Sequence, residues 1–471
     1  MDEGMWWDLI PLDSRWCVMR VLLQLRPSPD VVAAVADPTM STAASDVADA
    51  LPGVVLDPSY APVVAPRPVP AAGGGDPLSL NQPLAFSFAD DEASVLVRGE
   101  ISDDEVSTRI TLLPALRREV VGVFADPVIR PGLTCGGTPP VGDWHDVERL
   151  LGVADLAAEG LDGSGVALAI LDSGVNRAHV ARRLGREVTL DVGRSWKPEG
   201  VTGRAGEFPV DHGTMCAFDA LIAAPRASIV DVPVLLSRRP GGSALDGLLS
   251  DAVAAFAHLR TVLEDQPAAS RSLVISNSWG SFSPEWDFPA GHPGNYSDNP
   301  AHPFNLIVSS LERAGADVLF AAGNCGRDCP DGRCAYPERP ITGANSHAAV
   351  LSVGGVDTRG ERVGYSSQGP GRLFARKPDL CAYTHFSGSR AFGDDEPDSG
   401  TSAACPVAAG LVAAVRTLWP ASRLSPAQLR TLLRRTADDR SDVGFDDDHG
   451  YGVVDPSGVL ASLRRRAGRV P

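Results

Sequence analysis

The chain has 471 residues and a formal net charge of −17, because 59 Asp and Glu outnumber 42 Lys and Arg. A chain this acidic, with scattered cations, lacks the basic face that nucleic-acid binding requires. Only Lys197 and Lys377 are lysines, which leaves little room for Schiff-base or Ser/Lys chemistry. No run of 18 apolar residues predicts a membrane-spanning helix. We therefore expect a large and a smaller globular domain, with neither nucleic acid nor membrane as a partner.

The beginning of the chain lacks the pattern of a secretory signal. Residues 1–8 are acidic, whereas such a signal carries a basic segment before an apolar one. The apolar run at 18–25 is interrupted by Arg20 and has the pattern of a strand. The sequence therefore predicts a cytoplasmic location.

The first part of the chain alternates between strand and helix patterns, in the order β-α-β, spacer, β-α-β. This order predicts a small α+β unit of the ferredoxin-like type over residues 15–130, with a Pro- and Gly-rich insertion at about 66–83. A Gly- and Pro-rich linker over 131–147 follows. Strands are expected at 16–26, 53–64, 94–98 and 119–128, and helices at 29–51 and 102–117.

A different pattern begins at about residue 148, where helical stretches alternate with short continuous apolar runs. Continuous apolar strands are buried on both faces, as in a parallel sheet covered by helices. Each run ends near Gly, Ser, Asp or Asn, and such strand ends carry the functional residues of open α/β sheets. We expect a doubly wound α/β domain over 148–465. The runs are 166–174, 228–235, 273–280, 317–324 and 349–356.

Three segments contain the components of nucleophilic catalysis. Asp172 ends a buried run, His212 begins an apolar helix in the run DHGT, and Ser402 begins another in GTSAACP. A serine hydroxyl needs a nearby base, and the base needs a carboxylate to fix its tautomer. A helix N-terminus also places backbone N–H groups beside Ser402. Asn324, at another strand end, offers an amide that can donate to a developing oxyanion.

These four segments, in this order and spaced 40, 112 and 78 residues apart, resemble the subtilisin-like serine proteases (subtilases) over about residues 150–462. The run GYGVVD at 450–455 is similar to the C-terminal signature of the same family. The resemblance implies a parallel sheet of the subtilisin type and an acyl-enzyme mechanism that requires no cofactor.

The resemblance also implies a role for each site residue. Ser402 would be the nucleophile, His212 the general base and then acid, and Asp172 the orienting carboxylate. Asn324 and the backbone N–H of Ser402 would form the oxyanion hole. The expected substrate-binding strand consists of Ser276, Asn277, Ser278, Trp279 and Gly280, which would pair with a peptide or protein substrate.

The N-terminal unit resembles the family's propeptide, which implies that it is an intramolecular inhibitor of a zymogen. The region at about 130–147 would then be an exposed cleavage region. Two other functions remain open. One is a dedicated peptide-processing protease or macrocyclase that acts on one partner peptide, and the other is a catalytically silent pseudoprotease or scaffold.

Three of the eight cysteines are crowded into one segment, as Cys325, Cys329 and Cys334. Their spacing is close to that of a zinc knuckle but one ligand short, and Cys135 or a histidine could supply the fourth. The alternative is a disulfide or free thiols in a tight loop. Cys216 and Cys405, near His212 and Ser402, are interpreted either as small buried hydrophobes or as a source of thiol-sensitive activity.

Two further features leave alternatives open. The acidic clusters at 394–398 and 446–448 are either calcium ligands or solvated loops. The long aromatic loop at 281–304 is either a surface insertion or a specificity lid. Residues 1–147 hold 21 acidic and 9 basic residues, so the acid excess belongs mainly to the N-terminal unit.

Overall fold

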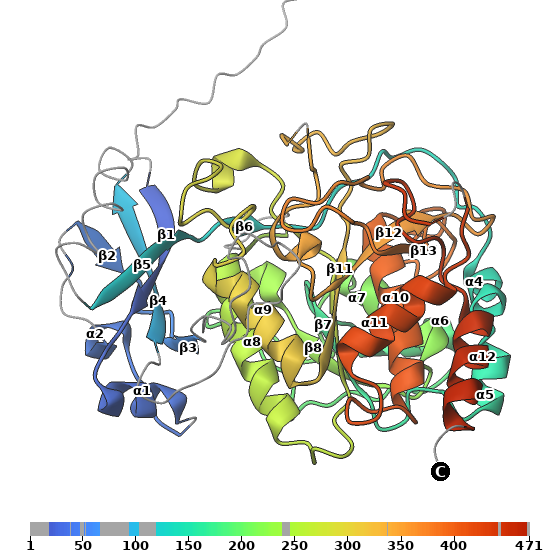
Figure 1. The fold of residues 1–471 in the computed structure, drawn as a ribbon, viewed down its shortest axis with the longest axis horizontal. Coiled ribbons are helices and arrows are strands. Elements are labelled where there is room, and N and C mark those ends of the chain that lie inside the picture. The colour runs from blue at the N-terminus through green and yellow to red at the C-terminus, as the bar shows by residue number, and fades with distance from the viewer. Residues whose placement is uncertain are drawn as a thin grey trace, which may run out of the picture.

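A computed structural model describes residues 18–37, 39–47, 51, 53–65, 94–102, 119–237, 245–336, 338–440 and 444–468. In Figure 1 a small sheet at the N-terminal end packs beside a larger domain built around a second sheet. None of the described helices has the length and apolar character that crossing a bilayer requires.

Six parallel strands form the sheet of the larger domain, in the order β13-β12-β11-β10-β7-β8. Nearly all of their residues are buried, which explains why the sequence shows continuous apolar runs instead of alternation. The α/β prediction is confirmed. The strands are β7 (Ala167–Leu171), β8 (Ser228–Val232), β10 (Leu273–Asn277), β11 (Ala316–Ala321), β12 (Leu351–Val356) and β13 (Leu380–Tyr383).

Helices cover both faces of this sheet and divide the hydrophobic core into two clusters. On one face lie α8 (Leu249–Glu264) and α9 (Pro303–Ala314). The other cluster contains α4 (Trp144–Leu150), α5 (Val153–Ala158), α6 (Arg177–Leu184), α7 (His212–Ala223), α10 (Thr401–Arg416), α11 (Pro426–Thr436) and α12 (Pro456–Ala467).

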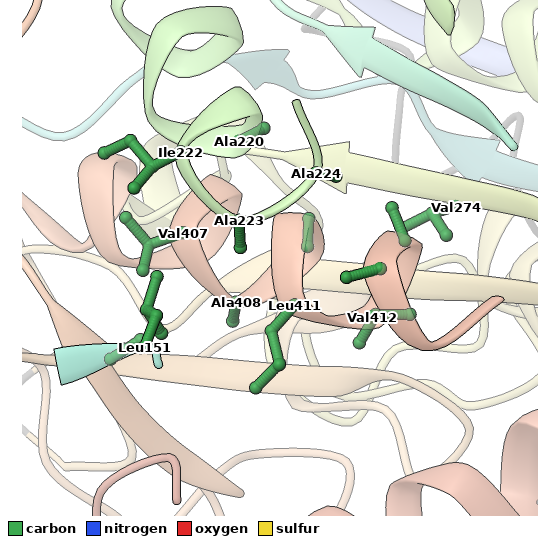
Figure 2. Packing of buried hydrophobic residues seen from close by; sticks show 14 of the residues in the cluster. Leu151, Ala220, Ile222, Ala223, Ala224, Val274, Val407, Ala408, Leu411 and Val412 are labelled. Atoms are coloured by element: carbon green, nitrogen blue, oxygen red, sulfur yellow. The ribbon is translucent and has the colours of Figure 1, made fainter. Parts of the chain in front are cut away.

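The helices α7 and α10, which begin at His212 and next to Ser402, are packed against each other over small side chains (Figure 2). A Cβ atom at Gly410 would lie 2.1 Å from the carbonyl oxygen of Ala220, so only glycine permits this close approach. Figure 2 shows Ala220 and Ala223 of α7, and Ala224 directly after it, near Val407, Ala408, Leu411 and Val412 of α10.

The N-terminal unit is an antiparallel sheet of order β2-β4-β1-β5, with β3 also beside β4. The ferredoxin-like type expected for this unit stays a prediction. The helix predicted at 102–117 and the insertion predicted at 66–83 lie almost entirely outside the described residues. The described elements are β1 (Val18–Leu25), α1 (Pro29–Ala36), α2 (Ala44–Val47), β2 (Val54–Leu56), β3 (Val63–Ala65), β4 (Ser94–Ser102) and β5 (Val120–Ala125).

Polar side chains of the N-terminal unit contact the beginning of α8. The guanidinium of Arg98 on β4 lies 3.1 Å from a carboxylate oxygen of Asp251, and the Tyr60 hydroxyl donates to the carbonyl of Ser250 at 3.1 Å. Asp126 accepts from the backbone N–H of Ser250 at 2.7 Å and from its hydroxyl at 2.8 Å. The N-cap residue of α8 is Leu248, whose side chain has no oxygen to accept a hydrogen bond from the first backbone N–H groups of the helix. Asp126, which is distant in sequence, accepts one of these hydrogen bonds instead and so caps the helix.

The two units are joined by residues 126–143, which include the short strand β6 (Val128–Ile129). This strand pairs antiparallel with β9 (Gly247–Leu248) of the larger domain. The remaining short elements are the 3-10 helices η1 (Val234–Leu236), η2 (Pro284–Trp286) and η3 (Gly343–Ser346).

Candidate active site

Asp172 and His212 form a buried hydrogen-bonded pair. Asp172 directly follows β7, and His212 is the first residue of α7, with Asp211 as its N-cap. His212 Nδ1 lies 2.8 Å from Oδ1 and 2.9 Å from Oδ2 of Asp172, so the Nδ1–H donates to the carboxylate. Burial disfavours the charged ring, but the Asp172 carboxylate outweighs it and raises the pKa of His212. The carboxylate therefore fixes the ring so that Nε2 is free to accept a proton.

Ser402 is the second residue of α10 and lies among buried residues. Its hydroxyl oxygen is 3.4 Å from the carbonyl oxygen of Ser278, and the Ser278 hydroxyl donates to the Ser402 carbonyl at 3.0 Å. The position at the N-terminus of a helix that is buried throughout gives Ser402 the positive end of the helix dipole.

The amide of Asn324 is held in one orientation. Its Oδ1 accepts from the backbone N–H and from the hydroxyl of Thr401, at 2.9 and 3.0 Å. The amide nitrogen is thereby turned the other way, and it donates to the carbonyl oxygen of Gly132 at 2.9 Å. Asn324 thus already binds a peptide carbonyl, the kind of group that an oxyanion-hole donor must contact.

The Gly132 carbonyl belongs to the linker of the same chain. The linker is extended here and pairs with two segments of the larger domain. Upstream, β6 pairs with β9. Arg130 then exchanges two backbone hydrogen bonds with Gly280, at 3.0 and 2.9 Å. The segment therefore adds a strand between two edges of the larger domain, which is how an extended peptide is bound by strand addition.

A carboxylate and a guanidinium hold the backbone on both sides of Gly132. Arg333 donates to the carbonyl of Pro131 at 2.9 Å, and the N–H of Leu133 donates to Asp331 at 2.7 Å. Asp331 and Arg333 are ion-paired to each other at 2.6 Å. The backbone of residues 130–133 is therefore held by hydrogen bonds, although the Leu133 side chain is 58% exposed. Residues 135–139 are exposed, as the sequence predicted.

The predicted substrate-binding strand is only partly beside the site. The backbone of Gly280 pairs with Arg130, and Ser278 contacts Ser402. The side chains of the other three predicted residues are buried inside the larger domain. Ser276 contacts Cys405, Asn277 donates to the carbonyl of Leu319, and Trp279 packs on Phe304 and Phe320.

The crowded cysteines are bonded to each other. Cys325 pairs with Cys334, and Cys329 pairs with Cys135 of the linker, with Cα atoms 5.7 and 6.1 Å apart. These separations suit disulfides. The prediction of a metal site at Cys325, Cys329 and Cys334 is therefore wrong, and the alternative, a disulfide, is found. A cysteine in a disulfide has no thiolate with which to ligate a metal ion. Cys135, which together with a histidine was a candidate for the fourth metal ligand, is instead the disulfide partner of Cys329.

Cys216 lies between the members of the site. Its sulfur is 3.6 Å from Oδ2 of Asp172 and 3.5 Å from the carbonyl of Ser402. Burial raises the pKa of the Cys216 thiol, so it is neutral and acts as a weak donor. Among the described residues, Asp172, His212 and Cys216 are the only cluster whose ligand atoms could hold a metal ion, and there the carboxylate and imidazole are already paired.

The acidic clusters do not form a calcium cage. Asp398 accepts from the backbone N–H and the hydroxyl of Ser389, and Asp446 accepts from the backbone N–H groups of Asp448 and His449. Among the described residues of these two clusters, no three carboxylates bring their oxygens within 4.8 Å of one another, whereas calcium requires six to eight oxygens around one point.

Asp172 orients the His212 imidazole, and the Cys216 sulfur lies 3.8 Å from His212 Nδ1 and 3.5 Å from the carbonyl oxygen of Ser402, so the three segments that carry Asp172, His212 and Ser402 meet at one place. The sequence profile of the Subtilase family matches residues 163–452, and the chain belongs to that family.

Curated relatives agree with this assignment. The chain is 26% identical over 343 residues to furin from Bos taurus, covering 67% of this chain and 39% of furin. It is 26% identical over 375 residues to a calcium-dependent protease from a Nostoc strain, covering 66% of this chain and 49% of that protein. It is 26% identical over 302 residues to subtilisin DY from Bacillus licheniformis, covering 63% of this chain and 91% of the subtilisin. The match therefore spans less than half of the first two relatives.

Proposed function

We propose that this protein is a serine endopeptidase made as an autoinhibited zymogen, and that its first substrate is its own peptide bond between Gly132 and Leu133. The observation that carries the proposal is the placement of the Gly132 carbonyl. It accepts a hydrogen bond from Asn324 at the end of a strand that pairs with Gly280. A segment bound in this way both blocks the cleft and presents one bond to the catalytic residues.

In the proposed reaction the Ser402 hydroxyl oxygen attacks the carbonyl carbon while Nε2 of His212 takes its proton. Asn324 and the backbone N–H of Ser402 stabilise the resulting oxyanion; removing one such donor typically costs about 10²- to 10³-fold in rate. The C–N bond then breaks, and His212 gives the proton to the departing amine. Water attacks the acyl-enzyme by the same route and releases a carboxylate and free Ser402.

The electrostatics of the site predict the acid limb of the pH profile. Only a neutral imidazole can accept the serine proton, and the Asp172 carboxylate raises the pKa of His212 above its usual 6.5. Activity should therefore rise with pH through that raised pKa and fall as the pH drops below it.

The N-terminal unit would act as the inhibitor. It contacts α8 through Arg98 and Asp126, and residues 128–133 continue from it into the cleft. The two disulfides favour an oxidising compartment over the cytoplasm expected from the sequence, because reducing compartments keep thiols free. Although one relative is named a calcium-dependent protease, the acidic clusters here do not suit that ion, and no step requires it.

The test is incubation of the full chain followed by intact-mass measurement under reducing and non-reducing conditions. The wild-type chain should split after Gly132 and yield a new N-terminus at Leu133, whereas Ser402→Ala should remain whole. Ser399→Ala, three residues away, is the matched control and should process normally. Cleavage of the Ser402→Ala chain at the same bond, or unchanged peptidase activity in it, would contradict the proposal.

A further inference from the structure

The side chain of Arg130, in the segment that lies in the cleft, is held by two groups of the larger domain. Its Nε lies 2.6 Å from Oδ1 of Asp246, and its Nη2 donates to Oδ2 at 2.9 Å. The guanidinium carbon also lies 4.9 Å from the centre of the Trp286 ring. Both charged side chains are largely shielded, with 26% of Arg130 and 16% of Asp246 exposed.

This combination is specific for a guanidinium. A carboxylate that meets two of its nitrogens uses the planar fork of arginine, and an indole face adds a cation–π contact. Lysine offers a single charged point and no fork, so it fits the same pair less well. The contact therefore favours arginine over lysine, although both carry a positive charge.

Neither Asp246 nor Trp286 belongs to the N-terminal unit. Asp246 directly precedes β9, and Trp286 ends η2 within the aromatic loop at 281–304. Cleavage after Gly132 would remove Arg130 from the chain and leave both partners on the catalytic domain, where they can meet the next peptide. The aromatic loop is thus more than a surface insertion.

The backbone pairing fixes where an arginine must stand in a substrate. Arg130 is paired with Gly280, and two residues later the Gly132 carbonyl is bound by Asn324. A Cβ atom added to Gly132 would lie 3.0 Å from the Cβ and the amide nitrogen of Asn324, which is tighter than ordinary contact. The adjoining cavity measures about 20 Å³, which is room for about one water molecule, so the residue before the scissile bond should be small.

We propose that Asp246 and Trp286 form an arginine subsite, and that the substrates of this protease are polypeptides with arginine two residues before a glycine at the cleaved bond. This inference rests on the proposed function and deepens it. It also favours a processing protease with a defined recognition sequence over one that degrades proteins broadly.

The test uses the self-processed enzyme and quenched fluorescent peptides that copy residues 128–135, with Ser in place of Cys135. Peptides with Arg, Lys or Ala at the position of Arg130 are compared by kcat/KM. The Arg peptide should exceed the Ala peptide by about 10- to 100-fold, as expected for a shielded ion pair with one charge-assisted hydrogen bond plus a cation–π contact, and Lys should fall between them.

Variants of the subsite should remove this preference without stopping hydrolysis. Asp246→Asn keeps the shape but not the charge, and Trp286→Leu removes the ring. Both should lower kcat/KM for the Arg peptide towards that for the Ala peptide and leave the Ala peptide unchanged. Glu285→Gln, an exposed acid next to Trp286, is the matched control and should keep the full preference. Asp246→Arg should instead prefer a peptide with Glu at this position.

The outcomes separate the two proposals. Equal cleavage of the Arg and Ala peptides, together with fluorophosphonate labelling of Ser402, would overturn the arginine subsite and leave the endopeptidase standing. The Arg130–Asp246 pair would then only hold the protein's own segment. No cleavage of any peptide and no labelling of Ser402 would overturn both proposals.

Discussion

The larger domain and the N-terminal unit bury their residues to different extents. In the larger domain, α10 buries all sixteen of its residues between the parallel sheet and neighbouring helices. In the N-terminal unit, α1 has no fully buried residue, and Val55 on β2 is 72% exposed. Part of the unit's apolar surface, including Leu22, Tyr60 and Leu96, belongs to the same core cluster as α8 and α9.

The difference shows that the N-terminal unit is completed by its partner. Its own core cluster is small and includes Phe288 of the larger domain. Its polar contacts reach the beginning of α8 through Arg98 and Asp126, and they reach Gly294 and His302 through the backbone of Ala125. A small unit of this kind is expected to lose structure when it is separated from the larger domain.

The largest expected effect follows from separating the two regions. Residues 1–132 alone should show little fixed structure by circular dichroism, because a small core without α8 and α9 exposes its apolar surface to water. Structure should return when the fragment is refolded together with a second fragment, residues 133–471 carrying Ser402→Ala. A cooperative unfolding transition of the isolated fragment would show that it does not depend on its partner.

A smaller effect is expected when the charged contact between the regions is removed. Arg98→Met keeps the apolar stem but loses the ion pairs with Asp57 and Asp251 and leaves buried carboxylates unpaired. The inhibition constant of the fragment should rise by about 10- to 100-fold, equivalent to about 1.5–3 kcal/mol. Arg20→Met removes a more exposed pair with Glu100 inside the unit and should have much less effect. Equal effects of the two variants would refute the role assigned to Arg98.

The smallest predicted effect lies inside the larger domain, where Asp219 of α7 is fully buried beside Asp398. Burial raises the pKa of Asp219 well above its usual value and that of Asp398 to about 6. The folded state therefore keeps protons that the unfolded chain releases above pH 3.8, so stability falls as the pH rises from there towards and beyond 6.

Asparagine at position 219 has no proton to lose. The stability of Asp219→Asn should therefore fall less with rising pH than the stability of the wild type. Its denaturation free energy relative to wild type should increase by about 1 kcal/mol or more between pH 5 and pH 8, because one pKa unit is worth about 1.4 kcal/mol. Denaturant titration at the two pH values measures this difference. Asp395→Asn, in an exposed loop, is the control, and a pH-independent offset in Asp219→Asn would contradict the assignment.

The parallel sheet could be predicted because burial on both faces leaves continuous apolar runs in the sequence. Five strands were predicted in this way, whereas β13 was missed because its four residues follow directly on Lys377-Pro378-Asp379 and are too few to show a pattern. Local sequence also places Asp172, His212, Ser402 and Asn324 at strand ends or helix starts, where the structure has them.

The remaining parts of the site depend on contacts between distant segments, which local patterns do not encode. Asp246 and Trp286 are separated from Arg130 by more than a hundred residues, and nothing near them marks a binding role. The partner of Cys329 is 194 residues away. The resemblance places Ser276 and Asn277 in a strand that pairs with substrate through its backbone, and this stays a prediction, because the contacts of their buried side chains do not test backbone pairing.

The position of one crosslink has a thermodynamic consequence. The bond between Cys135 and Cys329 closes a loop of about 194 residues and so restricts the conformational freedom of the unfolded chain. In the chain-entropy model such a closure is worth about 5 kcal/mol. Because Cys135 lies three residues after Gly132, the crosslink would remain with the catalytic domain after the proposed cleavage. The mature protein would lose the docking contacts but keep an unfolded state of low entropy, which limits the loss of stability on activation.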